Sequence, residues 1–124
     1  MDLNDLIPSN DTIVVELEYK DKKLTNEDGS PMTIEVYLPH TKEYKQARHE
    51  RQDFYLSKQD ERLKSAEMEE LGLTFVAQTI KGWNITLKGE KPKFTVKRAV
   101  DVFEKLPFIP ELILEEVSKV EDFT

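Results

Sequence analysis

Two short segments near the N-terminus alternate between apolar and polar side chains, and this pattern limits the possible folds more than any other feature. The segments are TIVVELEY at 12–19 and MTIEVYL at 32–38. A period of two residues is typical of a β-strand with one buried face. The polar stretch between them contains Gly29 and Pro31, which favour turns. We therefore predict an antiparallel β-hairpin over 12–38, whose apolar face must pack on other elements because an isolated hairpin is only marginally stable.

Residues 41–80 are predicted to be a helical region. Thr41 follows Pro39 and is placed to cap a helix, and neither glycine nor proline occurs from Thr41 to Leu71. An interruption is expected at Ser57 or at Ser65. An apolar stripe with spacings of three, four and seven residues is formed by Leu73, Val76, Ala77 and Ile80.

The C-terminal part is predicted to contain an extended turn at 83–94 and a helical hairpin at 95–121. Thr95 is expected to cap the first of these helices, and Pro107 ends it. Its apolar stripe consists of Val96, Ala99, Val100, Phe103 and Leu106. The stripe of the second helix consists of Ile109, Leu112, Ile113, Val117 and Val120. The predicted fold is a single α+β domain over 1–124, with an N-terminal antiparallel β-hairpin packed on about four helices and a closing αα-hairpin.

Composition and charge exclude several classes of function. The chain has no cysteine, which excludes disulfides and thiolate catalysis. His40 and His49 are expected at the surface, so neither a metal nor another cofactor is predicted. A net charge of −7 argues against nucleic-acid binding, because phosphate contacts depend on basic residues. An acidic N-terminus and the lack of a long apolar run argue against export or membrane insertion and favour a cytoplasmic location.

An enzymatic function is not expected. The carboxylates of Glu67, Glu69 and Glu70 come from one helical run, whereas catalytic carboxylates converge from separate elements. No glycine-rich phosphate-binding loop occurs, and no serine has the surroundings of a nucleophile elbow.

Trp83 is the only tryptophan, and it lies beside the most basic stretch of an acidic chain. Residues 81–105 contain seven basic residues and three acidic ones. Two interpretations stay open: Trp83 is a core residue, or it anchors a protein interface with a basic rim. The candidate partner-binding residues are Tyr44, Phe54, Tyr55, Trp83, Lys88, Lys91, Lys93 and Arg98.

The C-terminal part, mainly residues 74–124, resembles the tail assembly chaperones of long-tailed bacteriophages. The similar features are Trp83 after a helix, a turn at Gly89 and Glu90, then Pro92, Phe94 and Thr95, a helix ending at Leu106 and Pro107, a second helix from Pro110, and a terminal Phe123. The resemblance implies a non-enzymatic protein of the host cytoplasm that binds tape-measure protein, tail-tube protein or both. It also implies that the protein keeps them soluble and is absent from the finished virion.

Two other classes of function remain open. One is a small structural virion protein, such as a tail-completion or connector subunit. The other is a regulator or an inhibitor of a host protein. The acidic ends suggest DNA mimicry as one form of this class, although the mixed charges of residues 41–64 argue against that form. Self-association is also left open.

Overall fold

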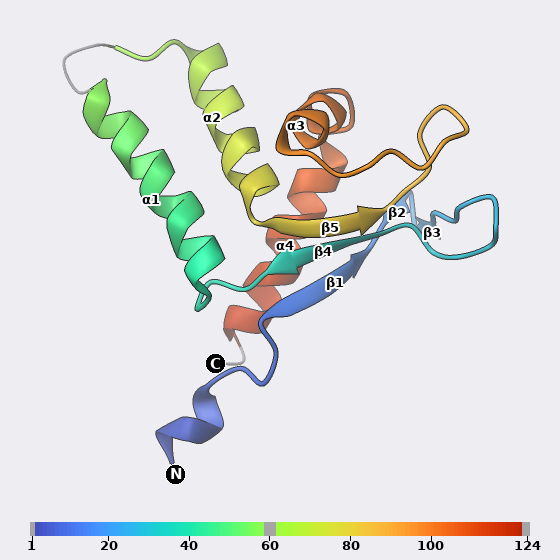
Figure 1. Ribbon diagram of the computed structural model, residues 1–124, viewed down its shortest axis with the longest axis horizontal. Coiled ribbons are helices and arrows are strands. Elements are labelled where there is room, and N and C mark those ends of the chain that lie inside the picture. Colours follow the sequence, from blue (N-terminus) through green and yellow to red (C-terminus); the bar gives the residue numbers. More distant parts are fainter. Residues whose placement is uncertain (1, 59–61, 123–124) are drawn as a thin grey trace.

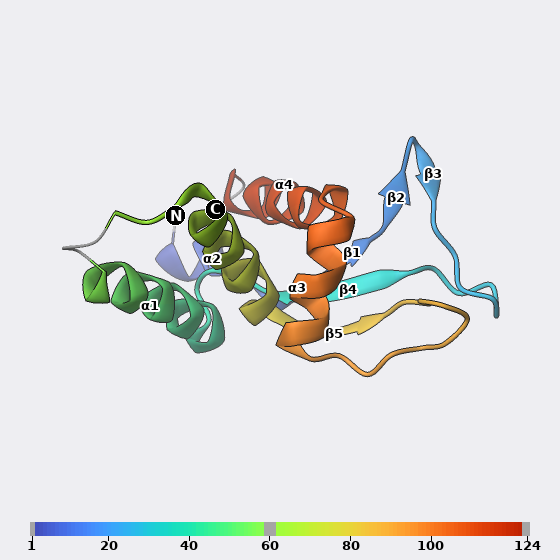
Figure 2. The same cartoon turned by 90° about the horizontal axis from the view of Figure 1, so that it is seen from above.

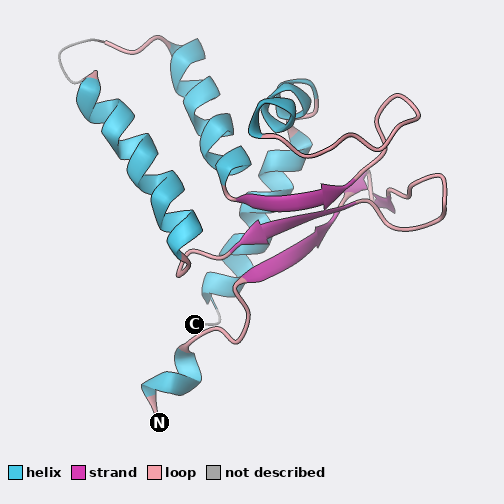
Figure 3. Ribbon diagram, viewed as in Figure 1, coloured by secondary structure: helices cyan, strands magenta, loops and turns pink. Residues whose placement is uncertain are grey.

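The computed structural model describes residues 2–58 and 62–122. The helices are the 3₁₀ helix η1 (Leu3–Leu6), α1 (Lys42–Ser57), α2 (Ser65–Gln78), α3 (Val96–Lys105) and α4 (Phe108–Asp122). The strands are β1 (Thr12–Glu16), β2 (Glu18–Tyr19), β3 (Lys22–Lys23), β4 (Thr33–Tyr37) and β5 (Ile80–Asn84). Figures 1 and 3 show β1, β4 and β5 side by side, with α1 and α2 to their upper left and with β2 and β3 beyond their right-hand end. This combination of strands and helices confirms the predicted α+β fold.

The predicted hairpin forms, and its apolar face is the buried one. β1 and β4 pair antiparallel, with Val15 opposite Ile34. Both side chains are buried, whereas Val14, on the other face of β1, is 61% exposed. The alternation in the sequence therefore predicts correctly that β1 pairs with β4 and which face of this hairpin is buried.

A third strand, β5, pairs with the other edge of β4, with Ile34 opposite Trp83. The extended segment predicted at 83–94 begins three residues too late. Ile80, which the sequence pattern places in a helical stripe, is the first residue of β5. The reason is that α2 ends before Thr79, whose carbonyl oxygen accepts a hydrogen bond from the backbone N–H of Tyr37 in the sheet.

β2 and β3 form a second, short ribbon that the sequence did not predict. The two residues between them, Lys20 and Asp21, have φ values of 52° and 65°. Such a turn usually contains glycine or asparagine. Because neither residue type is present here, the usual sequence signal for this turn is missing.

The helix boundaries follow local signals. Thr41 and Thr95 accept hydrogen bonds from the backbone N–H groups of Tyr44 and Arg98, so both predicted caps are confirmed. α1 ends at Ser57 and α2 begins at Ser65, as the expected interruption suggested.

The buried side chains form one cluster between the sheet and the helices. α4 packs against β1, and α2 contacts α1, α3 and α4 (Figure 2). In α3 the buried residues are Ala99, Val102 and Phe103, whereas Leu106 is 40% exposed. The prediction that Leu106 belongs to the buried stripe is therefore wrong: Leu106 is the residue directly after α3, and its φ of −129° and ψ of 71° lie outside the helical range.

Candidate protein-binding cleft

A cleft of about 310 Å³ opens beside Trp83, between α3 and the loop that follows β5. We call it the Trp83 cleft. Its lining residues are Trp83, Leu87, Lys88, Pro92, Arg98, Asp101, Val102, Lys105 and Leu106. It therefore combines apolar walls with several charged side chains.

Trp83 connects the cleft to the core. Its indole N–H donates a hydrogen bond of 2.9 Å to the carbonyl oxygen of Pro92. The ring meets Phe94 edge to face, with 5.2 Å between ring centroids. Trp83 packs against the buried cluster, as its interpretation as a core residue predicts, and it also lines the cleft. Its interpretation as an interface anchor stays a prediction.

A tight turn places two side chains at the edge of the cleft. The backbone N–H groups of Leu87 and Glu90 each donate to the other residue's carbonyl oxygen. Lys88 and Gly89, between them, have φ values of 54° and 76°, the conformation of a two-residue hairpin turn. Leu87 is 41% exposed as a result, and its apolar surface is open to a ligand.

The rim of the cleft is basic although the whole chain carries a charge of −7. Lys88, Arg98 and Lys105 line it, and Asp101 is the one acidic residue among the described lining residues. The guanidinium group of Arg98 donates a hydrogen bond of 2.7 Å to the carbonyl oxygen of Lys93, which restrains its position. This local excess of positive charge favours an acidic ligand.

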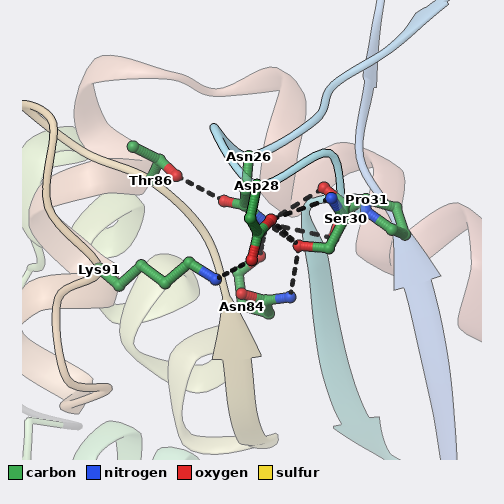
Figure 4. A network of polar contacts seen from close by, with 7 residues as sticks. All are labelled: Asn26, Asp28, Ser30, Pro31, Asn84, Thr86 and Lys91. Carbon is green, nitrogen blue, oxygen red and sulfur yellow. Dashed lines mark hydrogen bonds and ion pairs between the residues drawn. The ribbon is translucent and has the colours of Figure 1, made fainter.

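A buried asparagine ties the hairpin loop to the strand that leads into the cleft (Figure 4). Asn26 is 4% exposed, and its amide nitrogen lies 3.3 Å from the carbonyl oxygens of Ser30, Pro31 and Asn84. Its amide oxygen accepts a hydrogen bond of 2.6 Å from the hydroxyl of Thr86. Because these residues come from distant parts of the sequence, the network fixes where the loop after β5 begins.

An ion pair joins the same two loops. The ammonium group of Lys91 lies 3.1 Å from a carboxylate oxygen of Asp28, as Figure 4 shows. The hydroxyl and the backbone N–H of Ser30 donate to Asp28, and together with Lys91 they hold the pKa of Asp28 well below its ordinary value. Lys91 therefore contacts the hairpin loop through an exposed ion pair, and it is not among the residues that line the cleft.

The predicted residues of α1 lie away from the cleft. Tyr44 packs edge-on against Phe75, with 5.5 Å between ring centroids, near the base of α1. Phe54 is 36% exposed, and Tyr55 lines a separate hollow with Met68, between the end of α1 and the start of α2. Of the eight candidates, the structure brings Trp83, Lys88 and Arg98 together, and Lys93 contributes only its backbone oxygen to this group.

A second hollow of about 500 Å³ continues from the cleft past the end of α3. It is lined by Tyr19, Leu24, Lys105, Leu106, Pro107 and Phe108. The sequence does not predict this surface, because Tyr19 falls on the apolar face of the strand expected over 12–19 and Leu106 fits a helical stripe, whereas Tyr19 is 49% exposed. Pro107, which ends the helix directly after Leu106, was the available signal that Leu106 stands at a helix end.

Comparisons with known proteins give no family: no family model, no curated protein and no solved structure matches this chain. Within residues 2–58 and 62–122, no group of three or more His, Cys, Asp or Glu is placed to hold a metal ion. Among the helices of this described part, none combines the length and the hydropathy needed to cross a bilayer.

Proposed function

We propose that this chain is a protein-binding module that works as a phage tail assembly chaperone. In this role it holds tape-measure protein, tail-tube protein or both, and keeps them soluble until assembly. The observation that carries the proposal is the Trp83 cleft, in which exposed apolar side chains are bordered by basic ones on an otherwise acidic molecule. The cleft supports protein binding in general. The more specific role of a tail assembly chaperone is based on the resemblance of residues 74–124 to that family.

The cleft suits a ligand with an apolar stripe and acidic neighbours. A long helical tape-measure protein exposes such stripes until tube subunits cover it. Trp83, Leu87 and Leu106 offer apolar contact, and Lys88 and Arg98 would attract the acidic flank. Tryptophan at the centre of a contact often provides a large share of the binding energy.

The small size of the cleft predicts reversible binding. Burying one large apolar side chain contributes about 1.5–3 kcal/mol. Association itself costs roughly 4–15 kcal/mol, so a few such contacts leave a modest net affinity. Weak contacts repeated along a client would hold it and still give way to tube subunits.

Co-expression tests the proposal. The tape-measure or tail-tube protein encoded beside this chain should reach a higher soluble fraction when the chain is present. Reversing two rim charges, with Lys88→Glu and Arg98→Glu, should remove most of that increase. The matched control is Lys45→Glu with Arg48→Glu, which reverses the same two residue types on exposed positions of α1. No increase with the wild-type chain would contradict the proposal.

Mass spectrometry of purified virions separates a chaperone from a structural subunit. A chaperone acts in the host cytoplasm and leaves before the particle is complete, so its peptides should be absent from virions. Recovery in a fixed ratio to the tube protein would instead support a tail-completion or connector subunit.

A further inference from the structure

Residues 2–11, the N-terminal arm, are acidic and apolar, and the fold leaves them largely uncovered. Leu3, Leu6 and Ile7 are 76%, 40% and 61% exposed. None of the residues of η1, the helix of the arm, is buried. Three large apolar side chains so close together form a surface that a partner can cover.

The arm is only loosely attached to its own chain. A cavity of about 370 Å³ lies between its apolar side chains and Leu38, Pro39 and Val120. In the described part of the chain, the hydrogen bonds of residues 2–7 are local. The arm joins the body at Asp11, whose carbonyl oxygen accepts from the backbone N–H of Leu38. Residues 2–10 can therefore leave this position without breaking a bond of the sheet.

The arm and the Trp83 cleft are complementary in charge. Asp2 and Asp5 belong to the arm, and no basic residue occurs before Lys20. The rim of the cleft has three basic residues and one acidic residue among its described lining residues. Opposite charges across an interface speed association and favour one register.

The two surfaces also match in apolar character. The arm offers leucine and isoleucine side chains, and the cleft offers the exposed side chains of Leu87 and Leu106 beside the Trp83 ring. Burying the arm here would remove apolar surface from water on both partners, which favours binding. The arm and the cleft therefore carry opposite charges, and both expose apolar side chains.

The arm is better placed for another copy's cleft than for its own. In both Figure 1 and Figure 2 the arm lies to the left of the sheet and the loop that follows β5 lies to its right. β1 holds the chain from Thr12 at the sheet end opposite Asn84, so an arm reaching its own cleft must fold back along the sheet. We infer that the N-terminal arm of one copy binds in the Trp83 cleft of a second copy.

This self-association goes beyond the proposed function and does not depend on it. Reciprocal exchange of arms gives a dimer, whereas head-to-tail binding gives rings or chains. A client that uses the same cleft must displace the arm, so self-association would cover the apolar cleft while no client is bound.

A charge swap tests the inference by sedimentation velocity over a wide concentration range. The wild-type chain should associate as its concentration rises, and added salt should weaken this association. The arm variant Asp2→Lys with Asp5→Lys and the cleft variant Lys88→Glu with Arg98→Glu should each associate about tenfold or more weakly. Mixing the two variants restores opposite charges at both contacts, so the mixture should associate like the wild type. A wild type that stays monomeric, or a mixture that does not recover, overturns the inference.

A peptide of residues 2–11 provides a second readout, because Trp83 is the only tryptophan of the chain. Added to protein that lacks residues 2–10, the peptide should change the tryptophan emission in a saturable way. A scrambled peptide of the same composition should not. Peptide binding with a wild type that remains monomeric would mean that the arm occupies its own cleft, which also overturns the inference. None of these outcomes alters the co-expression test, so the two proposals fail separately.

Discussion

The indole nitrogen of Trp83 and the carbonyl oxygen of Pro92 are joined by a hydrogen bond of 2.9 Å across nine residues. The bond closes the loop that forms one wall of the cleft, between β5 and the cap of α3. Trp83 therefore has two roles: its hydrogen bond to Pro92 helps to shape the cleft, and its ring is expected to contact the ligand.

Trp83→Phe removes this hydrogen bond and keeps an aromatic ring near Phe94. We expect the free energy of unfolding to fall by about 1–3 kcal/mol, since the Pro92 carbonyl oxygen loses its partner and some packing is lost. Urea unfolding followed by circular dichroism measures the change. Tyr55→Phe, at a side chain away from the cleft, is the control. Equal stability of Trp83→Phe and wild type would show that the bond does not close the loop.

Gly89→Ala should strain the turn that presents Leu87 and Lys88. Gly89 has a φ of 76°, which an alanine adopts at a cost of about 1–2 kcal/mol. Gly82→Ala is the matched control, because nothing lies within 4 Å of the added Cβ and its backbone needs no positive φ. Thermal unfolding should show a lower Tm for Gly89→Ala and a change of at most a degree or two for Gly82→Ala. A larger loss of Tm for Gly82→Ala than for Gly89→Ala would contradict the turn geometry.

Asn26→Asp keeps the shape of the side chain but replaces the donor that faces three carbonyl oxygens with an acceptor. Because the site is buried, the unpaired groups should cost about 1–3 kcal/mol of stability. Asn10→Asp, at an exposed position, should change stability by less than about 0.5 kcal/mol. Chemical denaturation of the three proteins gives the comparison. A neutral Asn26→Asp would mean that the amide does not hold the two loops together.

Asp28 should make the stability of the protein depend on acid pH. Its pKa is lowered in the folded state, so the ionised carboxylate stabilises the fold at pH values above the ordinary aspartate pKa of about 4. This stabilisation disappears as the pH falls through the lowered folded pKa. The difference in unfolding free energy between wild type and Asp28→Asn should therefore shrink from about pH 6 to about pH 2. Glu27→Gln is the neighbouring control, and a pH-independent difference for Asp28→Asn would contradict the account.

The parts of the fold that the sequence predicted are those with local signals. The β1–β4 hairpin follows from alternation, and the caps at Thr41 and Thr95 follow from single side chains beside a helix start. The start of β5 is predicted too late because its pairing partner, β4, is more than forty residues away in the sequence. The local pattern does not show that a third strand pairs with the free edge of β4.

The candidate site was predicted in part. Trp83, Lys88 and Arg98 were found because an aromatic residue in a basic stretch of an acidic chain is unusual. Leu106 was missed because its spacing fits the helical stripe, and only the end of α3 exposes it. Lys91 was included for its charge, but its ion pair with Asp28 depends on a loop that lies distant in the sequence.

Titration with tryptophan-free fragments of the tape-measure protein, followed by the emission of Trp83, shows whether the Trp83 cleft holds the client. For the wild type, the emission should change in a saturable way. Binding should be about tenfold or more weaker for Lys88→Glu with Arg98→Glu, and it should be unchanged for Lys45→Glu with Arg48→Glu. Fragments that bind without changing the emission of Trp83, or that bind both double variants equally well, would contradict the claim that this cleft holds the client.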